Sequence, residues 1–473
     1  MCAAALAAVA HGQTDLERFE RQLEQFRRDT QARVDQALPP GQRALVKYGG
    51  YLTLDYLSLD DPAGRNHVLR QAELVGYGRL NLDGVHDLFF RGRAGYQDFA
   101  PGDSFDGRGD DWIDPRVERA FYRFDLQRYR DLGGAEPSNL TASFQLGRDL
   151  IYWANGLVLS QVLDGAVVDL GYGPVDLRLV AGVTDRDVVD FDASRPDFVD
   201  DTRRGFYGAM LGARAGPHRP FVYFLSQQDY NEDETVVLTS PAAGRVETAF
   251  DYQSYYVGVG AAGAIGDRLA YGAELVYEGG AGLSNSVALG PAGEPLGQTE
   301  EPINAFAADL RLDYLFADPR DTRLSAEVIL ATGDADRLHT SNTIGGNRPG
   351  TDDEAFNAFG LLNTGLAFNP PPSNLAMVRV GFSTTPFPEV AALRRLQVGA
   401  DLFVFNKLRA NAPIDEPTDD GRYLGFEPDL FLNWRITSDV TLAVRYGVFF
   451  PGEAILSDDQ PRQVFFTGVT FAF

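Results

Sequence analysis

The sequence predicts an all-β protein, a transmembrane antiparallel β-barrel of about 18 strands with a short N-terminal periplasmic helix. Three observations predict this class. Apolar and polar residues alternate in segments of about ten residues through most of the chain. Short and long connections follow each other in turn. The chain also ends on an alternating apolar segment, 464–473, whose last residue is Phe473.

The alternation begins at about Lys47, where Tyr48, Leu52 and Leu54 lie on one face and Thr53 and Asp55 on the other. Residues 72–83 and 87–97 repeat the pattern, with arginines and carboxylates on the polar face. A soluble β-sandwich also alternates, but it would not continue through the whole chain without forming another domain. The pattern therefore favours strands that face lipid on one side and a lumen on the other.

Connection lengths give each strand a direction. Short turns are predicted at Asp83-Gly84 and at 171–174, 215–220, 265–268 and 317–322, and long polar loops near 58–70, 98–114, 184–204, 228–248 and 279–303. Bacterial barrels have short periplasmic turns and longer external loops. We therefore expect the short turns to be periplasmic.

The direction of the strands fixes their number. A first count gives 19 segments, with 356–368 as one of them. Both termini of a bacterial barrel are periplasmic, which requires an even number. Counting back from the C-terminus, the tight turn Thr437-Ser438 makes 407–423 external and 386–392 periplasmic. Residues 332–374 then form one long external loop, and 18 strands remain.

The chain is predicted to have three parts. Residues 1–10 resemble the end of a secretory signal peptide, with an Ala8-Val9-Ala10 cleavage pattern, and are too short to span a bilayer as a helix. Residues 14–38 form an amphipathic helix that ends before Pro39-Pro40. We expect it to pack at the periplasmic mouth, with a small trimerising coil as the alternative. Residues 45–473 form the barrel.

Composition excludes several classes of protein. The net charge of −25 argues against nucleic acid as a partner, while 44% hydrophobic residues exclude general disorder. The five histidines are scattered, and the sequence contains no nucleophile elbow, HExxH motif or P-loop. We therefore expect no enzyme activity and no cofactor.

The predicted pore lining is rich in arginine. Following the alternation, the inward face carries Arg79, Arg91, Arg93, Arg119, Arg123, Arg178, Arg311, Arg379, Arg435 and Arg445, together with Glu73, Asp87, Asp125, Asp176, Asp309, Asp313, Glu327, Asp401 and Asp429. Guanidinium groups could bind passing anions in a constriction. Alternatively, arginines and carboxylates pair as scaffold. The sequence favours neither reading, but it places Arg91, Arg93, Arg119 and Arg123 on neighbouring strands as one basic patch.

The external loops are acidic, most densely at 103–114 and 185–201. Their spacing matches no complete EF-hand. We expect solvated charge or charge bridged to lipopolysaccharide, with weak Ca²⁺ binding as the alternative, and we assign no metal ligand.

Three stretches resemble the alginate-export-like family of outer-membrane β-barrels. They are Phe144–Leu170, in which Leu146-Gly147-Arg148 is followed by Asp164-Gly165-Ala166, the hairpin 374–405, and Tyr446–Glu453 before the last strand. The resemblance implies an 18-stranded barrel that transports a hydrophilic solute or polymer. The helical prefix is instead similar to that of some trimeric porins.

We therefore expect a channel of the bacterial outer membrane for passive diffusion or export of hydrophilic solutes, anionic ones included, or polysaccharide. Its expected partners are membrane lipid, lipopolysaccharide and the solute, and it is expected to be a monomer or trimer. The alternative is a structural or adhesive barrel whose acidic loops bind cations, lipopolysaccharide or a surface layer.

Overall fold

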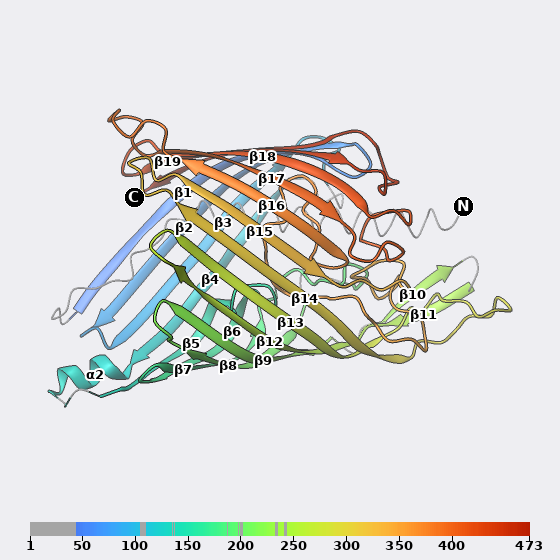
Figure 1. The fold of residues 1–473 in the computed structure, drawn as a ribbon, viewed down its shortest axis with the longest axis horizontal. Helices are drawn as coiled ribbons and strands as arrows, with labels where there is room; N and C mark the ends of the chain where they lie inside the picture. Colours follow the sequence, from blue (N-terminus) through green and yellow to red (C-terminus); the bar gives the residue numbers. More distant parts are fainter. Residues whose placement is uncertain are drawn as a thin grey trace.

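The computed structural model describes residues 44–473 apart from 105–109, 135, 137, 187, 197, 199–201, 232–234 and 241–243. These residues form a closed barrel of 18 antiparallel strands (Figure 1). The barrel closes by pairing of its first and last strands, from Tyr51 opposite Ala472 to Leu59 opposite Val464. The predicted signal remnant, 1–10, and the predicted helix, 14–38, lie outside the described residues.

The strands follow each other around the barrel in chain order, β9 being paired directly with β12. The barrel strands are β1 (Ala44–Asp60), β2 (Asn66–Leu82), β3 (His86–Phe99), β4 (Asp111–Asp125), β5 (Leu140–Tyr152), β6 (Ser160–Tyr172), β7 (Val175–Thr184), β8 (Arg204–Ala213), β9 (His218–Asp229), β12 (Tyr252–Ile265), β13 (Leu269–Leu283), β14 (Glu300–Leu315), β15 (Arg323–Ala331), β16 (Leu375–Thr384), β17 (Leu396–Asn406), β18 (Tyr423–Arg435), β19 (Val440–Pro451) and β20 (Arg462–Ala472).

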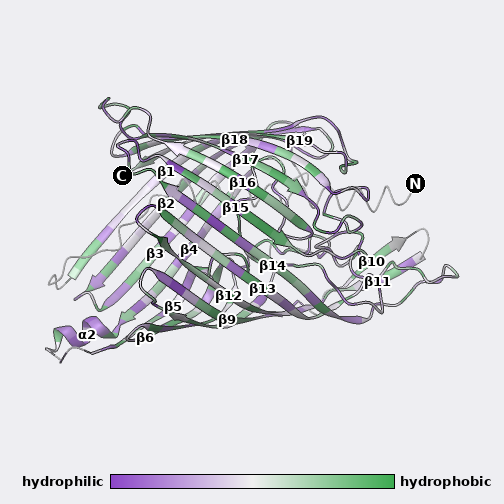
Figure 2. Ribbon diagram, in the orientation of Figure 1, coloured by the Kyte–Doolittle hydropathy of each residue, from purple (hydrophilic) through white to green (hydrophobic). Residues whose placement is uncertain are grey.

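Side chains alternate between the two faces of the wall, as the sequence predicts. On β1, Leu54 is exposed on the outer face while its neighbour Thr53 is buried inside. Hydrophobic and hydrophilic residues alternate in this way along most of the strands (Figure 2). Because a bilayer solvates apolar side chains, this outward apolar face is the arrangement a membrane-spanning barrel requires.

Several connections differ from the predicted loops. β1 and β2 have 17 residues each, so the loop expected at 58–70 is shortened to 61–65. The polar residues at these strand ends continue the ladder, and the Asn66 side chain donates to Asp60 at 2.8 Å. Polarity here marks the part of the strands near the rim, not a loop.

The long connection 332–374 contains no strand, which confirms the parity argument. Two other elements were missed. The expected loop 228–248 contains a separate hairpin, β10 (Thr235–Ser240) and β11 (Gly244–Ala249), which extends beyond the rim (Figure 1). The connection after β4 contains the helix α2 (Leu126–Leu132), whose N-cap is Asp125. In the described part of the chain, no helix has the length and apolar character to cross a membrane.

The ladder between β4 and β5 is unusually short. It joins Ala120–Asp125 to Ser143–Arg148, whereas Asp111–Arg119 pairs with β3 alone. Pro115 lies in that part of β4, and proline belongs on strand edges because it has no N–H to donate. The Arg148 side chain reaches across the seam to the carbonyl of Val117 at 3.0 Å.

The two triplets that resemble the alginate-export family face each other in register. Leu146, Gly147 and Arg148 of β5 pair with Ala166, Gly165 and Asp164 of β6. Gly147 has a φ of +124°, and a Cβ there would lie 2.2 Å from the carbonyl oxygen of Ala120. The glycine is therefore needed for close approach of β4 and β5.

The barrel interior as candidate functional site

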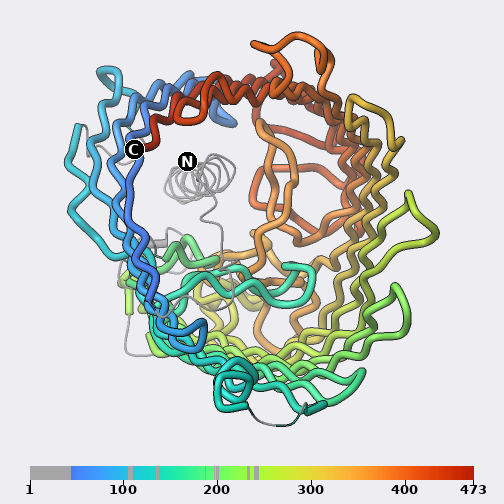
Figure 3. The backbone as a smooth tube through the Cα atoms, turned by 90° about the vertical axis from the view of Figure 1, so that its left-hand side faces the viewer, coloured from blue at the N-terminus to red at the C-terminus, as the bar shows by residue number. Residues whose placement is uncertain are grey.

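A segment of the long connection crosses the barrel interior. We call residues 356–368 the strap; Figure 3 shows the connection inside the ring of strands. At its beginning, Phe356 packs in a buried cluster with Tyr256 of β12. At its end, Phe368 stacks on Phe449 of β19 with ring centroids 4.2 Å apart. Leu362 packs against both clusters, so the strap links two separate parts of the wall.

Wall carboxylates hold both ends of the strap. Glu278 of β13 accepts a hydrogen bond from the backbone N–H of Asn357 at 2.8 Å. Glu427 of β18 accepts three successive backbone N–H groups, from Leu366 at 2.5 Å, Ala367 at 2.6 Å and Phe368 at 2.8 Å. A carboxylate can satisfy several donors of an irregular segment at once, and such bonds are stronger than neutral ones.

The connection between β5 and β6 also folds inward. We call residues 153–159 the tip. The backbone N–H of Asn155 donates to Glu274 of β13 at 3.0 Å. The tip is hydrogen-bonded to the strap, because Phe359 donates to the carbonyl of Val158 at 2.8 Å. Tip and strap therefore narrow the interior together.

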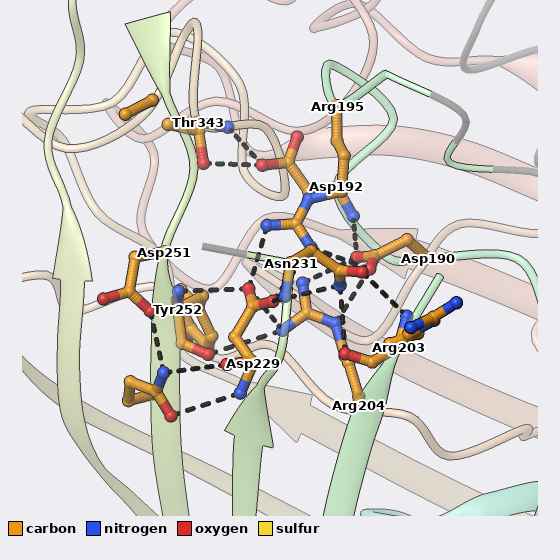
Figure 4. Close-up of polar contacts among 12 residues, drawn as sticks. Asp190, Asp192, Arg195, Arg203, Arg204, Asp229, Asn231, Asp251, Tyr252 and Thr343 are labelled. Carbon is orange, nitrogen blue, oxygen red and sulfur yellow. Dashed lines mark hydrogen bonds and ion pairs between the residues drawn. The ribbon is translucent and has the colours of Figure 1, made fainter. Parts of the chain in front are cut away.

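A buried ionic cluster fixes the connection 185–203 to the rim (Figure 4). Arg204 forms ion pairs with Asp190 at 2.8 Å and with Asp229 at 3.1 Å, and Arg195 pairs with Asp229 at 2.9 Å. The neighbouring Asp192 accepts the N–H of Thr343 at 3.1 Å, which joins this connection to 332–374. Burial raises the pKa of Asp192 although Arg195 opposes it. Both arginines have carboxylate partners, so the role of the cluster is to stabilise the fold of this connection.

The predicted basic patch lies on the inner face of β3 and β4. Arg91 and Arg119 are direct neighbours in register. Arg91 pairs with Glu118 at 2.6 Å and Arg119 with Asp149 at 3.3 Å. Each guanidinium therefore has a carboxylate beside it.

The other predicted arginines of this wall also have polar partners. Arg79 pairs with Asp87 at 2.7 Å, and Arg93 pairs with Glu73 at 3.3 Å. Arg123 donates to the side chain of Gln145 at 3.0 Å. Leaving aside the strand-end residues Asp111 and Asp125, the inner face of β2 to β5 carries six arginines against four carboxylates. They are Arg79, Arg91, Arg93, Arg116, Arg119 and Arg123, and Glu73, Asp87, Glu118 and Asp149.

Glu118 was missed because strict alternation from Arg119 places it on the outer face. The β3–β4 register shifts between Arg91 and Gly92, so Glu118 is an extra residue in a bulge. The bulge turns its carboxylate inward, within 2.6 Å of Arg91 and 3.6 Å of Arg93. Pro115 just before it was the available sequence signal.

The opposite part of the wall is acidic. Leaving aside the strand-end residues Arg323 and Arg435, the inner face of β13 to β18 carries nine carboxylates against two arginines: Glu274, Glu278, Glu301, Asp309, Asp313, Glu327, Asp401, Glu427 and Asp429, and Arg311 and Arg379. Arg379 pairs with Glu327 at 2.6 Å, and Arg311 pairs with Asp313 at 3.2 Å. Glu274, Glu278 and Glu427 were not predicted as pore residues; as described above, they bind the tip and the strap.

The remaining predicted residues lie away from the strap. Arg178 pairs with Asp169 at 2.7 Å, Arg435 donates to the carbonyl of Ser438 in the turn after β18, and Arg445 donates to Asn433 at 2.9 Å. Asp176 is next to the turn between β6 and β7, and Asp125 caps α2. These positions are close to the end where the short turns lie.

The acidic loops carry no evident metal site. Within the described ranges, no group of three or more His, Cys, Asp or Glu side chains is arranged to hold a metal ion. The predicted acidic stretch at 103–114 lies partly outside the described residues. Ca²⁺ binding there stays a prediction.

A closed 18-stranded barrel with an apolar outer face and a charged interior is the architecture of an outer-membrane channel. The chain belongs to the alginate export family, whose model matches residues 161–466. It is accordingly an outer-membrane protein of the solute-channel class.

Solved structures support the fold. The chain is similar to Pseudomonas aeruginosa OccK9 (OpdG), with 14% identity, 90% of this chain and 98% of that chain covered, and a TM-score of 0.53. It is also similar to OccK11 (OpdR) of the same organism, with 13% identity, 90% and 96% covered, and a TM-score of 0.51. OpdK of the same organism, solved with vanillate, gives 13% identity, 90% and 98% covered, and a TM-score of 0.50. No curated sequence matches the chain.

Proposed function

We propose that this protein is a passive channel for hydrophilic solutes and that anionic groups pass along the arginine-rich wall. The separation of charge inside the barrel carries the proposal. With strand-end residues left aside, arginines exceed carboxylates on β2 to β5, whereas carboxylates exceed arginines on β13 to β18. Such a distribution creates a field across the lumen, which orients a solute and holds its anionic groups near one wall.

The position of the strap supports this route. An 18-stranded barrel is wide enough to leave an aqueous lumen unless loops fill it. The strap is bonded to β12 and β13 at one end and to β18 and β19 at the other. The arginines of β2 to β5 are not among these anchors, and the side chain of Arg119 is 24% exposed. Anions in the lumen therefore have access to that wall.

Planar-bilayer recording tests the channel and its selectivity. Replacing Arg91 and Arg119 with serine removes two positive charges and leaves Glu118 and Asp149 without these partners. The reversal potential in a salt gradient should shift toward cation preference, most strongly at low salt, because local charges are then least screened. If the wild type is already cation-selective and the double substitution changes nothing, the arginines are scaffold and the anionic route is wrong.

A structural or adhesive barrel is the second candidate, and the strap is the observation that favours it, because it fills part of the lumen. The two candidates predict different conductance. A barrel plugged by the strap would show none in the wild type and would conduct only after deletion of residues 356–368. Stepwise conductance in the wild type would exclude a plugged barrel. Release assays with oligouronates and with small carboxylates would then distinguish a polysaccharide from a small solute.

A further inference from the structure

A polar cavity of about 470 Å³ lies on the acidic side of the interior. Its walls are residues 361–363 of the strap, Asn155 of the tip, and the inner faces of β13 to β16. Charged lining residues come from the barrel wall: Asp309, Arg311, Asp313, Glu327 and Arg379. The cavity is thus bounded by the two inward-folded segments and by the part of the wall richest in carboxylates.

Asp309 is the unusual member of this lining. It is 5% exposed, and its side chain forms neither a hydrogen bond nor an ion pair with any residue the structure describes; its Oδ1 atom is buried without a partner. Its cross-strand neighbour is Glu274, another carboxylate. Glu274 is satisfied, because it accepts the Tyr223 hydroxyl at 2.6 Å and the N–H of Asn155 at 3.0 Å.

The cations of the cavity have other partners. Arg379 is paired with Glu327 at 2.6 Å, and Arg311 with Asp313 at 3.2 Å. Pairing these groups leaves the carboxylate of Asp309 as the excess charge. A buried carboxylate without a donor is costly, so such a group in a cavity points to a ligand that supplies one.

We propose that this cavity is a binding subsite for the primary ammonium group of a hydrophilic solute of amino-sugar size, with the ammonium donating to Asp309. The Asn155 side-chain nitrogen, buried and without an acceptor among the described residues, donates to a hydroxyl oxygen of the same solute. The assignment rests on the proposed function, because the solute reaches the cavity through the lumen. The acidic subsite and the arginine-rich wall would together accept solutes that carry both charges.

Calorimetric titration of the detergent-solubilised full chain at pH 7 tests the subsite. Glucosamine, which is largely protonated at that pH, should bind, whereas N-acetylglucosamine and glucuronate should bind at least tenfold more weakly. Asp309→Asn keeps the shape of the side chain but removes its charge, and should weaken glucosamine binding at least tenfold. Heat-modifiable mobility on gels checks that each variant forms a barrel.

Two further variants distinguish binding in the cavity from general effects of a substitution on the barrel. A Cβ at Gly272 would lie 3.6 Å from the Asn155 amide nitrogen, an ordinary contact, so Gly272→Leu should fill the cavity and abolish binding without altering charge. Asp169→Asn is the matched control. It removes one carboxylate from the same barrel at a position paired with Arg178, outside the cavity, and should leave glucosamine binding unchanged.

The outcomes distinguish the two proposals. Equal binding of glucosamine and N-acetylglucosamine, or undiminished binding by Asp309→Asn, would overturn the ammonium subsite even where bilayer conductance confirms a channel. Binding that is selective for glucosamine and lost in both cavity variants would support the subsite. If the barrel binds glucosamine in this way but shows no conductance, the channel proposal is wrong and the subsite proposal is retained.

Discussion

Replacing Glu427 with glutamine should loosen the end of the strap. The carboxylate is completely buried and accepts the N–H groups of Leu366, Ala367 and Phe368. Glutamine retains one oxygen acceptor but presents an NH₂ group to at least one of these donors. Hydrogen bonds to charged groups contribute about 1.5–3 kcal/mol each, so a loss of about 3 kcal/mol from strap attachment is expected.

A loss of that size raises the population of the detached end roughly a hundredfold, since about 1.4 kcal/mol corresponds to a tenfold change. Phe368 remains stacked on Phe449, so the strap should detach intermittently, not permanently. Single-channel recordings of Glu427→Gln should therefore show frequent transitions to a higher-conductance level that is rare in the wild type.

Glu416→Gln is the matched control. Glu416 is also a buried glutamate with several donors, from Arg462 and Ser457, but it lies outside the strap. It should alter stability without adding the higher level. If the single-channel conductance of Glu427→Gln equals that of the wild type, the strap does not limit conductance. If both variants show the same new conductance level, the effect is not specific to the strap.

Two further predictions concern stability. Arg204→Met should destabilise the barrel by about 3–5 kcal/mol, because it leaves Asp190 and Asp229 buried without that partner; a thermal midpoint within error of the wild type would contradict this. Burial alone would raise the pKa of Asp61, but hydrogen bonds from His67 and from the backbone and side chain of Arg65 hold it at about 2. A lowered pKa stabilises the folded loop above pH 4, and this contribution of about 2 kcal/mol should disappear as the pH falls from 4 to 2. Thermal unfolding in that range should therefore depend on pH less in Asp61→Asn than in the wild type, and equal dependence would exclude the proposed role of Asp61.

The wall of the barrel could be predicted from sequence because its two faces have different solvents. Period-two alternation, turn chemistry and parity are local or additive properties, and they led to 18 strands and to the removal of 356–368 from the strand count. Strand ends were less predictable, since polar residues such as Ser58 and Asn66 still belong to the ladder near the rim.

The interior could not be predicted in the same way. Alternation says that Arg91 points inward, but its partner depends on a bulge that reverses Glu118. The strap binds Glu427, about 60 residues away in the chain, through its backbone N–H groups, which leave no trace in residue type. The orphaned state of Asp309 likewise depends on which neighbours are already paired, and this is a property of the folded barrel alone.

The short ladder between β4 and β5 makes the wall uneven around its circumference. Six residue pairs join these strands, against nine between β1 and β20, where the two ends of the sheet meet. The interstrand hydrogen bonds resist tension around the circumference of the barrel, so the barrel should open first at β4–β5. It would then become one curved sheet that still contains the paired first and last strands. Arg148, bonded to Val117 on one side and to Asp164 and Asp185 on the other, supplies at this place the cohesion that backbone pairing supplies elsewhere. The point of closure in the sequence and the point of least mechanical resistance are therefore different places in this molecule.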